Sequence, residues 1–195
     1  MSRENQTTRA RILSATISLL ESGSAPAVRM SDIAKASGIS RQALYLHFPN
    51  RADLLVAAVR HLDETHQIDA RLAPSRAAAD GVERLREWVS VWADYIPQIY
   101  GVAKALLALQ HSDAEARAAW QDRMAAVRHG CAAVITALEN QGRLTDALSP
   151  DEATDLLATL LSVHGWEQLH QEANWSQQRY VEVMQQTAAR ILLAN

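Results

Sequence analysis

Residues 33–45 read IAKASGISRQALY, and this stretch decides the fold of the N-terminal part of the chain. Its pattern predicts two short helices joined by a tight turn. Gly38 makes the turn, because glycine readily adopts the left-handed conformation that closes a helix. Ser40 is placed to cap the following helix. Ile39 and Leu44 are the apolar plugs between the two helices, so the stretch reads as a helix-turn-helix.

The flanking sequence extends this motif on both sides. Apolar residues at helical spacing predict a first helix that ends near Gly23. A second helix is expected over about residues 30–37. The third is expected over Arg41–His47, because Phe48 precedes Pro49 and a residue before proline is pushed out of the α region.

The remaining sequence is also helical in pattern. Asn50 is expected to cap a helix that runs to the neighbourhood of Pro74, and a loop of small residues, APSRAAADG, follows. No alternation typical of strands is present, so the sequence predicts an all-α fold of about nine helices. The last five are expected over about residues 82–96, 97–107, 113–142, 150–171 and 177–193.

Charge is distributed unevenly along the chain, although the net charge is only −3. Residues 1–51 contain seven Lys or Arg and three Asp or Glu, whereas the rest contains 12 basic and 19 acidic residues. A basic head joined to an acidic body fits a protein whose N-terminal part alone meets nucleic acid. The alternative is chance clustering of surface charge.

Composition narrows the class of protein. Hydrophobic residues make up 48% of the 195 residues, which is enough for a packed core. No apolar run approaches the roughly 18 residues that a membrane span needs, and the polar N-terminus lacks a secretory pattern. The single cysteine, Cys131, has no partner for an internal disulfide, and its apolar surroundings favour a buried, inert thiol over a redox sensor. We therefore expect a cytoplasmic protein without membrane contact.

The first turn of the third helix carries the candidate base-reading residues. With Leu44 facing inward, the side chains of Arg41, Gln42 and Ala43 point away from the core. A helix presented in this way fits the major groove of DNA. There Arg41 can donate two hydrogen bonds to guanine, Gln42 can pair with adenine, and Ala43 can contact a thymine methyl group.

Three further residues are candidates for phosphate contacts. Tyr45 and His47 lie further along the same helix and carry suitable donors. Arg51 lies in the first turn of the next helix, where the helix dipole disfavours a cation, and a bound phosphate would offset that effect. The alternatives are a half-buried core aromatic for Tyr45, an ordinary surface histidine for His47, and a solvated charge for Arg51.

Residues 31–55 resemble the signature of the TetR family of repressors, and the preceding helix extends the resemblance to roughly residues 8–60. The resemblance implies that Arg41, Gln42 and Ala43 read bases. It implies phosphate contacts for Tyr45, His47 and Arg51, with Arg51 in place of the usual lysine. Position 29 is often threonine or serine in relatives, so Arg29 leaves the cap of the second helix open.

The resemblance also implies a division of the chain. Residues 1–50 would form the DNA-binding domain. Residues 51–195 would bind a ligand inside a helical bundle and form a homodimer through the last two helices. The aromatic residues of this part fit an apolar cavity, although plain core filling is the alternative. The candidate lining residues are Trp92, Tyr95, Trp120, Met124 and His164.

Together these features predict a DNA-binding regulator, most simply a repressor that a small hydrophobic or amphipathic ligand releases from a palindromic operator. The expected partners are double-stranded DNA, that inducer and a second copy of the chain. Neither a metal nor a cofactor is expected, since His111, His164 and His170 lack metal-site spacing. Two alternatives stay open. One is a small enzyme that uses a carboxylate or histidine in the bundle, for which no catalytic motif is present. The other is a helical adaptor that keeps the N-terminal head but binds a protein, or a ligand-free regulator that responds to a partner.

Overall fold

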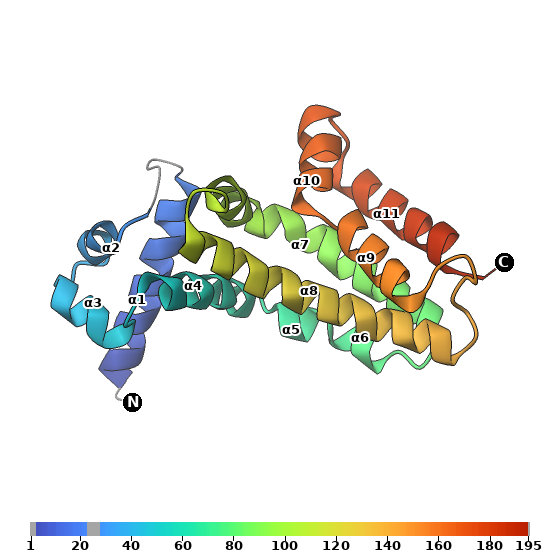
Figure 1. The fold of residues 1–195 in the computed structure, drawn as a ribbon, viewed down its shortest axis with the longest axis horizontal. Coiled ribbons are helices and arrows are strands. Elements are labelled where there is room, and N and C mark those ends of the chain that lie inside the picture. The colour runs from blue at the N-terminus through green and yellow to red at the C-terminus, as the bar shows by residue number, and fades with distance from the viewer. Residues whose placement is uncertain (1–2, 23–27, 195) are drawn as a thin grey trace. The chain divides into compact units, whose positions relative to one another are not determined.

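The computed structural model describes residues 3–22 and 28–194, and nearly all of them are helical. The predicted all-α fold is therefore confirmed. Gly23, predicted to end the first helix, lies outside the described residues. In chain order the elements (Figure 1) are α1 (Arg3–Glu21), α2 (Met30–Ala36), α3 (Arg41–His47), α4 (Arg51–Thr65), α5 (Ile68–Arg71), α6 (Ala73–Ala77), α7 (Gly81–Leu109), α8 (Ala114–Asn140), α9 (Pro150–Leu160), α10 (Val163–Trp166), the π-helix η1 (Glu167–Glu172) and α11 (Gln177–Leu192).

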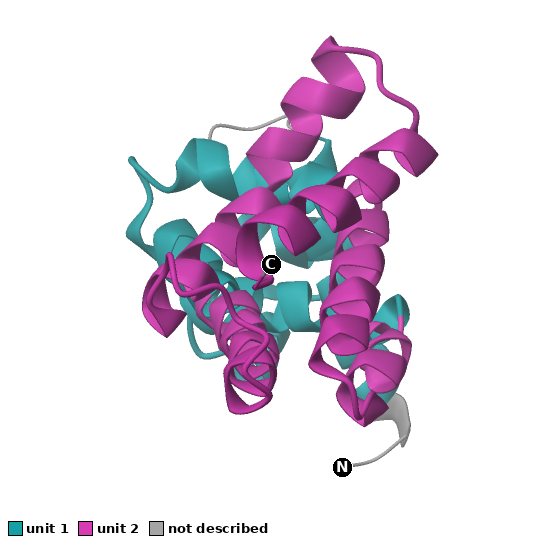
Figure 2. Ribbon diagram, turned by 90° about the vertical axis from the view of Figure 1, so that its right-hand side faces the viewer, with its two compact units in different colours: residues 1–66, 99–124 teal, residues 67–98, 125–195 magenta. Residues whose placement is uncertain are grey.

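Contacts divide the chain into two compact units (Figure 2). The N-terminal unit comprises residues 1–66 and 99–124, and the C-terminal unit comprises residues 67–98 and 125–195. Helices α7 and α8 each contribute residues to both. In the part of the chain that the structure describes, we find no helix with the length and apolar character that crossing a membrane requires.

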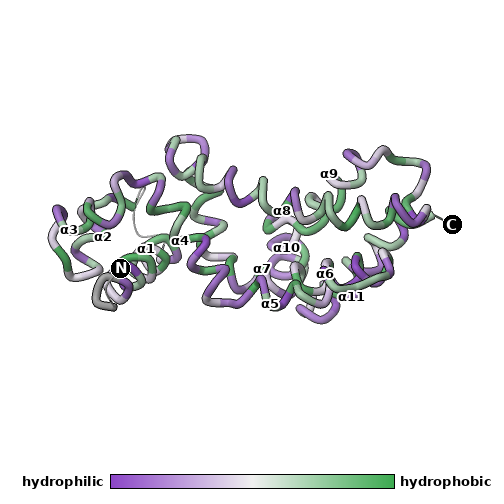
Figure 3. The backbone as a smooth tube through the Cα atoms, turned by 90° about the horizontal axis from the view of Figure 1, so that it is seen from below, coloured by the Kyte–Doolittle hydropathy of each residue, from purple (hydrophilic) through white to green (hydrophobic). Residues whose placement is uncertain are grey.

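In the N-terminal unit, α1 packs against α2 and α4, and α2 packs against α3. Figure 3 shows hydrophobic and hydrophilic residues alternating along these helices, as expected when each buries one face. The buried faces meet in one core, which includes Ile12, Leu13, Ile33, Ala34, Leu44, Phe48, Leu54 and Leu55. This core fixes the inner side of α3 and leaves its outer side uncovered.

The local signals of the helix-turn-helix are confirmed. Gly38 has a φ of +66°, a left-handed conformation that an L side chain adopts only with strain. The Ser40 hydroxyl accepts a hydrogen bond from the Ala43 backbone N–H (3.1 Å) and caps α3. Asn50 caps α4 in the same way, because its Oδ1 accepts from the Asp53 backbone N–H (2.8 Å).

The helix that follows Asn50 is shorter than predicted. It ends at Thr65 instead of near Pro74, and Gln67 takes a left-handed φ of 52° before α5 begins. The predicted loop of small residues is partly helical, because Pro74 lies in the first turn of α6. Proline suits that position, where its missing N–H is not needed. Pro74 was predicted to end a helix, but it lies at the start of α6.

The break predicted at Pro97 is also wrong, because α7 is continuous through it. Proline inside a helix leaves the carbonyl four residues earlier without its helical donor. Here that carbonyl belongs to Ala93, and the side-chain amide of Gln177 donates to it through Nε2 (2.9 Å). The replacement donor comes from α11, so no pattern near Pro97 announces it.

The helix predicted over residues 150–171 is divided. Ser149 and Glu152 form the predicted capping box, but α9 ends at Leu160. Ser162 is extended, and its hydroxyl accepts from the Gly165 N–H (3.1 Å), which starts α10. The chain then continues as the π-helix η1. The ring of Trp166, at the end of α10, stacks on the ring of His170 in η1, with the centroids 4.6 Å apart.

Aromatic side chains fill the core of the C-terminal unit. Trp92 lies 5.7 Å from Trp88 and 5.6 Å from Tyr95 between ring centroids, and all three are buried. Trp88 packs directly over Gly130 of α8, where an added Cβ would lie 2.0 Å from its Cη2 atom. Next to Gly130, burial raises the pKa of Cys131 to about 12, so its thiol stays protonated and unreactive at neutral pH.

Candidate nucleic-acid interface

Helix α3 presents its leading turn to solvent. Arg41 and Gln42 are exposed and Ala43 is half-buried, whereas Leu44 is fully buried. Further along, Tyr45 is 44% exposed and His47 is half-buried. The core therefore holds α3 by one side, and the residues predicted to read bases lie on the other.

A groove of about 590 Å³ runs beside α3 and contains three arginines. Of the six predicted DNA-contacting residues, the groove brings together Arg41, Tyr45 and Arg51, whereas Gln42, Ala43 and His47 do not line it. All its lining residues belong to the N-terminal unit: Arg29, Met30, Ser31, Arg41, Tyr45, Pro49, Asn50, Arg51 and Glu115.

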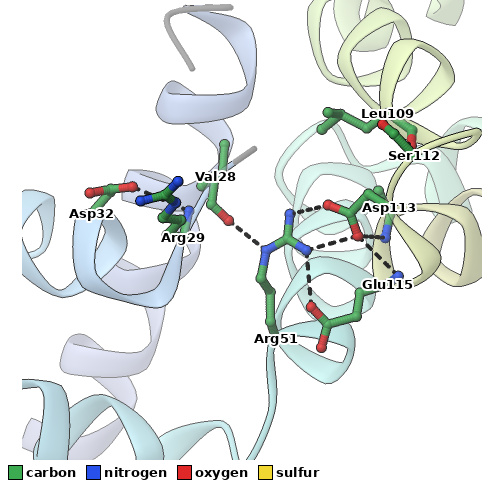
Figure 4. A network of polar contacts seen from close by, with 9 residues as sticks. Val28, Arg29, Asp32, Arg51, Leu109, Ser112, Asp113 and Glu115 are labelled. Atoms are coloured by element: carbon green, nitrogen blue, oxygen red, sulfur yellow. Dashed lines mark hydrogen bonds and ion pairs between the residues drawn. The ribbon is translucent and has the colours of Figure 1, made fainter. Parts of the chain in front are cut away.

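Arg51 is held by three partners inside the unit (Figure 4). Its Nε donates to the carbonyl oxygen of Val28 (2.5 Å). Its Nη1 and Nη2 lie 2.9 Å and 2.7 Å from the two carboxylate oxygens of Asp113, and Nη1 also donates to Glu115 Oε2 (2.9 Å). The side chain is only 12% exposed. The anions that offset its unfavourable place at the start of α4 are thus two carboxylates of the protein itself.

The charges of this cluster reinforce one another. Burial alone would lower the pKa of Arg51, but its hydrogen bonds and charge interactions with Asp113 and Glu115 raise the pKa above its usual value. The hydrogen bond from Arg51 lowers the pKa of Asp113, helped by the backbone N–H groups of Ala116 and Glu115. Both ions therefore stay charged at neutral pH.

The structure shows how the start of α2 is capped without a side-chain acceptor at position 29. Arg29 occupies the cap position but has no side-chain acceptor to offer. Instead the Asp32 carboxylate accepts from the Arg29 backbone N–H (3.3 Å; Figure 4). The Arg29 side chain is therefore not needed as a cap, and it lines the groove.

Known proteins are similar to this chain in the region that contains the helix-turn-helix. The sequence model described as bacterial regulatory proteins, tetR family, matches residues 12–58. The HTH-type transcriptional regulator TtgR of Pseudomonas putida is 34% identical over 84 residues, which make up 43% of this chain and 40% of TtgR.

The N-terminal part of the chain, residues 12–58, is therefore similar to the TetR family of bacterial regulatory proteins. The resemblance stated from the sequence is thus confirmed, and the match is to a family of regulatory proteins and not of enzymes. The alignment with TtgR spans well under half of that relative's length.

Solved structures share the TetR fold over nearly the whole chain. A protein from Saccharomonospora viridis, solved in complex with choline, has a TM-score of 0.75 and 22% identity, covering 97% of this chain and 100% of that one. NalD of Pseudomonas aeruginosa, the secondary repressor of the MexAB-OprM multidrug efflux pump, has a TM-score of 0.71 and 20% identity, covering 99% of each chain. At this identity the likeness shows the fold.

Two features of this N-terminal unit were missed from the sequence. Leu46 is 84% exposed, on the outer side of α3 next to Tyr45. Helical spacing offered a signal, because Leu44 and Phe48 lie four residues apart on the inner face and Leu46 falls between them. Arg29, considered only as a cap, adds a cation to the groove.

The predicted ligand-lining residues are dispersed over the two units. Trp92 and Tyr95 pack edge-on in the core of the C-terminal unit. Trp120 packs against the core of the N-terminal unit, to which the half-buried Met124 also belongs. His164 is 72% exposed, and its Nδ1 lies 3.9 Å from Glu167 Oε2. The ligand pocket therefore stays a prediction. Among residues 3–22 and 28–194, no cluster of three His, Cys, Asp or Glu suited to a metal ion is found.

Proposed function

We propose that the protein is a DNA-binding transcriptional regulator that acts as a repressor and leaves its operator when a small hydrophobic or amphipathic ligand binds. One observation carries the DNA-binding part. Arg41 and Gln42 stand exposed on the leading turn of α3, while Leu44 is buried beneath them. This is the geometry in which a recognition helix enters the major groove.

The proposed roles follow from this arrangement. Arg41, Gln42 and Ala43 contact base edges, with Arg41 suited to guanine and Gln42 to adenine. Tyr45 and His47 contact phosphates and fix the register of α3 on the duplex. Arg51 was predicted with them, but its side chain is held by Asp113 and Glu115 of the same unit.

Ligand release is supported by relatives of the same fold. NalD is the repressor of a drug efflux pump, and the protein from Saccharomonospora viridis was solved with choline. A ligand that favours one conformation by about 1–3 kcal/mol changes DNA affinity about 5–150-fold, which is enough for regulation. The aromatic core of the C-terminal unit suits an apolar ligand.

We further propose a homodimer, which would place two copies of α3 in successive major grooves about 34 Å apart on a palindromic operator. Leu156 on α9 and Ile191 on α11 are large apolar side chains that stay 41% and 37% exposed. They lie on the two stretches expected to meet the second copy. Replacing both by glutamate should convert a dimer to a monomer in light scattering, whereas an unchanged mass would place the interface elsewhere.

Fluorescence anisotropy with the DNA that flanks the protein's own gene tests the proposed function. The wild-type protein should bind at low salt, and Arg41→Ala and Tyr45→Phe should bind more weakly. Unchanged binding by both variants would reject this DNA face. A thermal-shift screen of small apolar compounds then tests the sensor, because ligands that stabilise the protein should also release the DNA.

A further inference from the structure

We propose that Arg51 is a positioning residue that sets the orientation of the recognition helix α3 from inside the protein, and that it does not contact DNA phosphate. This inference rests on the proposed DNA binding and assigns Arg51 a role within it.

The first argument is that the guanidinium is already held by partners inside the protein. Its three nitrogens face the Val28 carbonyl oxygen, both Asp113 oxygens and Glu115 Oε2 at 2.5–2.9 Å. A phosphate would have to displace at least one carboxylate from a side chain that is 12% exposed. Two carboxylates also outweigh the single positive charge, so the cluster as a whole does not attract an anion.

The second argument is where the contacts lie in the chain. Val28 is buried and stands two residues before α2, whereas Arg51 is the first residue of α4. The hydrogen bond between them joins the two ends of the α2–α3 motif and closes it into a ring (Figure 4). The direction of α3 depends on this closure, because α3 lies inside the ring.

The third argument is that the start of α8 holds the closure in place. Asp113 Oδ1 accepts from the backbone N–H groups of Glu115 and Ala116 (both 3.1 Å), so the carboxylate that grips Arg51 is itself fixed by α8. Lysine offers one ammonium group in place of a planar fork and does not satisfy these acceptors in the same geometry. Arginine at this position is thus suited to the protein's own carboxylates.

The same two helices provide a matched control. Arg60 of α4 and Asp122 of α8 form an ion pair of 2.9 Å, but their side chains are 62% and 38% exposed. This pair joins α4 to α8 without contacting the α2–α3 motif. Arg60→Lys and Asp122→Asn therefore make the same chemical changes as Arg51→Lys and Asp113→Asn without opening the ring. The substitution Asp113→Asn keeps a side-chain oxygen that can cap α8 while it removes the charge.

The test measures the Kd of the full-length protein for a duplex that the wild-type protein selects from a random pool, at several salt concentrations. The temperature is kept below the melting of every variant. Arg51→Lys and Asp113→Asn should each weaken binding about tenfold, in the range of coupling through a packed network. Their plots of log Kobs against log salt should keep the wild-type slope, and the double variant should bind about as weakly as either single one. The control variants should bind like the wild type.

Three results would overturn the inference. If Arg51 contacts phosphate, Asp113→Asn should tighten binding, and Arg51→Met should flatten the salt slope by about 0.9 per lost contact. If the cluster serves stability alone, the variants should melt earlier and keep the wild-type Kd. If Arg51→Lys binds DNA like the wild type, the planar guanidinium group is not needed to orient α3. A wild-type protein that selects and binds no duplex contradicts the proposed function itself, and the inference falls with it.

Discussion

In the helix-turn-helix and in the region where α7 meets α11, some backbone groups have no hydrogen-bond partner within their own helix. The two regions supply the missing partners differently. In the helix-turn-helix, Ser40 and Asn50 each accept a hydrogen bond from the N–H three residues along the chain. In the C-terminal unit, the Ala93 carbonyl that Pro97 leaves free is satisfied by Gln177, 84 positions away. The caps of the helix-turn-helix are therefore supplied locally, whereas the carbonyl freed by Pro97 is satisfied by a residue far along the chain.

This difference has consequences for how each region responds to change. The caps at Ser40 and Asn50 need no distant residue, and the helix-turn-helix depends on distant chain only where Asp113 and Glu115 hold Arg51. In the C-terminal unit a change at Gln177 would reach two other elements, since Gln177 donates to Ala93 and also accepts from Trp166 Nε1 (2.9 Å). Such sensitivity suits the proposed ligand-sensing part, and constancy suits the proposed DNA-reading part.

The largest effect is expected where the C-terminal unit depends on close approach of two helices. Gly130→Ala places a Cβ 2.0 Å from Trp88 Cη2, so Trp88 or α8 must move. The free energy of unfolding should fall by about 3 kcal/mol, at the upper end for overpacked cores. Chemical denaturation measures it. Gly101→Ala is the control, because its Cβ comes no closer than 3.0 Å to another atom, the Cγ of Glu21. A variant as stable as wild type would mean that Trp88 does not pack on Gly130.

The next effect tests the distant hydrogen bonds. Gln177→Ala removes the donor to the buried Ala93 carbonyl and the acceptor of Trp166 Nε1. An unmet buried carbonyl is costly, so we expect a loss of about 2 kcal/mol in the free energy of unfolding. Gln178→Ala, which loses only an exposed contact with Glu182, should change stability little. Equal losses for the two variants in urea titrations would contradict the special role of Gln177.

A smaller effect is expected from the local contacts of the helix-turn-helix. Ser40→Ala removes the cap of α3 and should lower the free energy of unfolding by about 1 kcal/mol. Ser40→Asp retains an acceptor and should largely restore stability. Hydrogen exchange of the Ala43 amide provides the readout, since Ser40 Oγ is its acceptor. Fast exchange in Ser40→Asp as well would show that the hydroxyl is not acting as a cap.

The smallest effect concerns acid. The folded pKa of Asp113 lies below its usual value because of Arg51. Stability from its ionised form is therefore present above the unfolded pKa of about 3.9 and is lost as the pH falls below it. Asp113→Asn should show a weaker fall in melting temperature below about pH 4 than the wild type. Parallel curves for the two proteins would mean that Arg51 does not hold this carboxylate in solution.

The same contrast explains what the sequence could predict. The turn at Gly38, the cap at Ser40 and the extent of α3 rest on signals within residues 38–49, and all three are confirmed. The end of a helix at Pro97 was predicted wrongly, because the residue that rescues α7 there lies in α11. The division of the predicted last-but-one helix at Ser162 had only a weak signal in the small residues nearby.

In the candidate site, too, the features set by nearby residues could be predicted, and those set by distant residues could not. The exposure of Arg41 and Gln42 followed from the helical spacing around Leu44. The surroundings of Arg51 did not, since Asp113 and Glu115 lie 62 and 64 positions away. A cation at the start of α4 predicts a nearby anion, but the fold is needed to show that the anions are Asp113 and Glu115.

The most direct test of the account compares the sequences that wild-type protein and Arg41→Ala select from a random DNA pool. We expect the wild-type protein to select a palindromic DNA sequence. We expect Arg41→Ala to lose the preference at one base pair in each half-site, with a discrimination loss of roughly 1–3 kcal/mol, while the other positions are kept. An unchanged selected site would contradict the claim that the leading turn of α3 reads DNA.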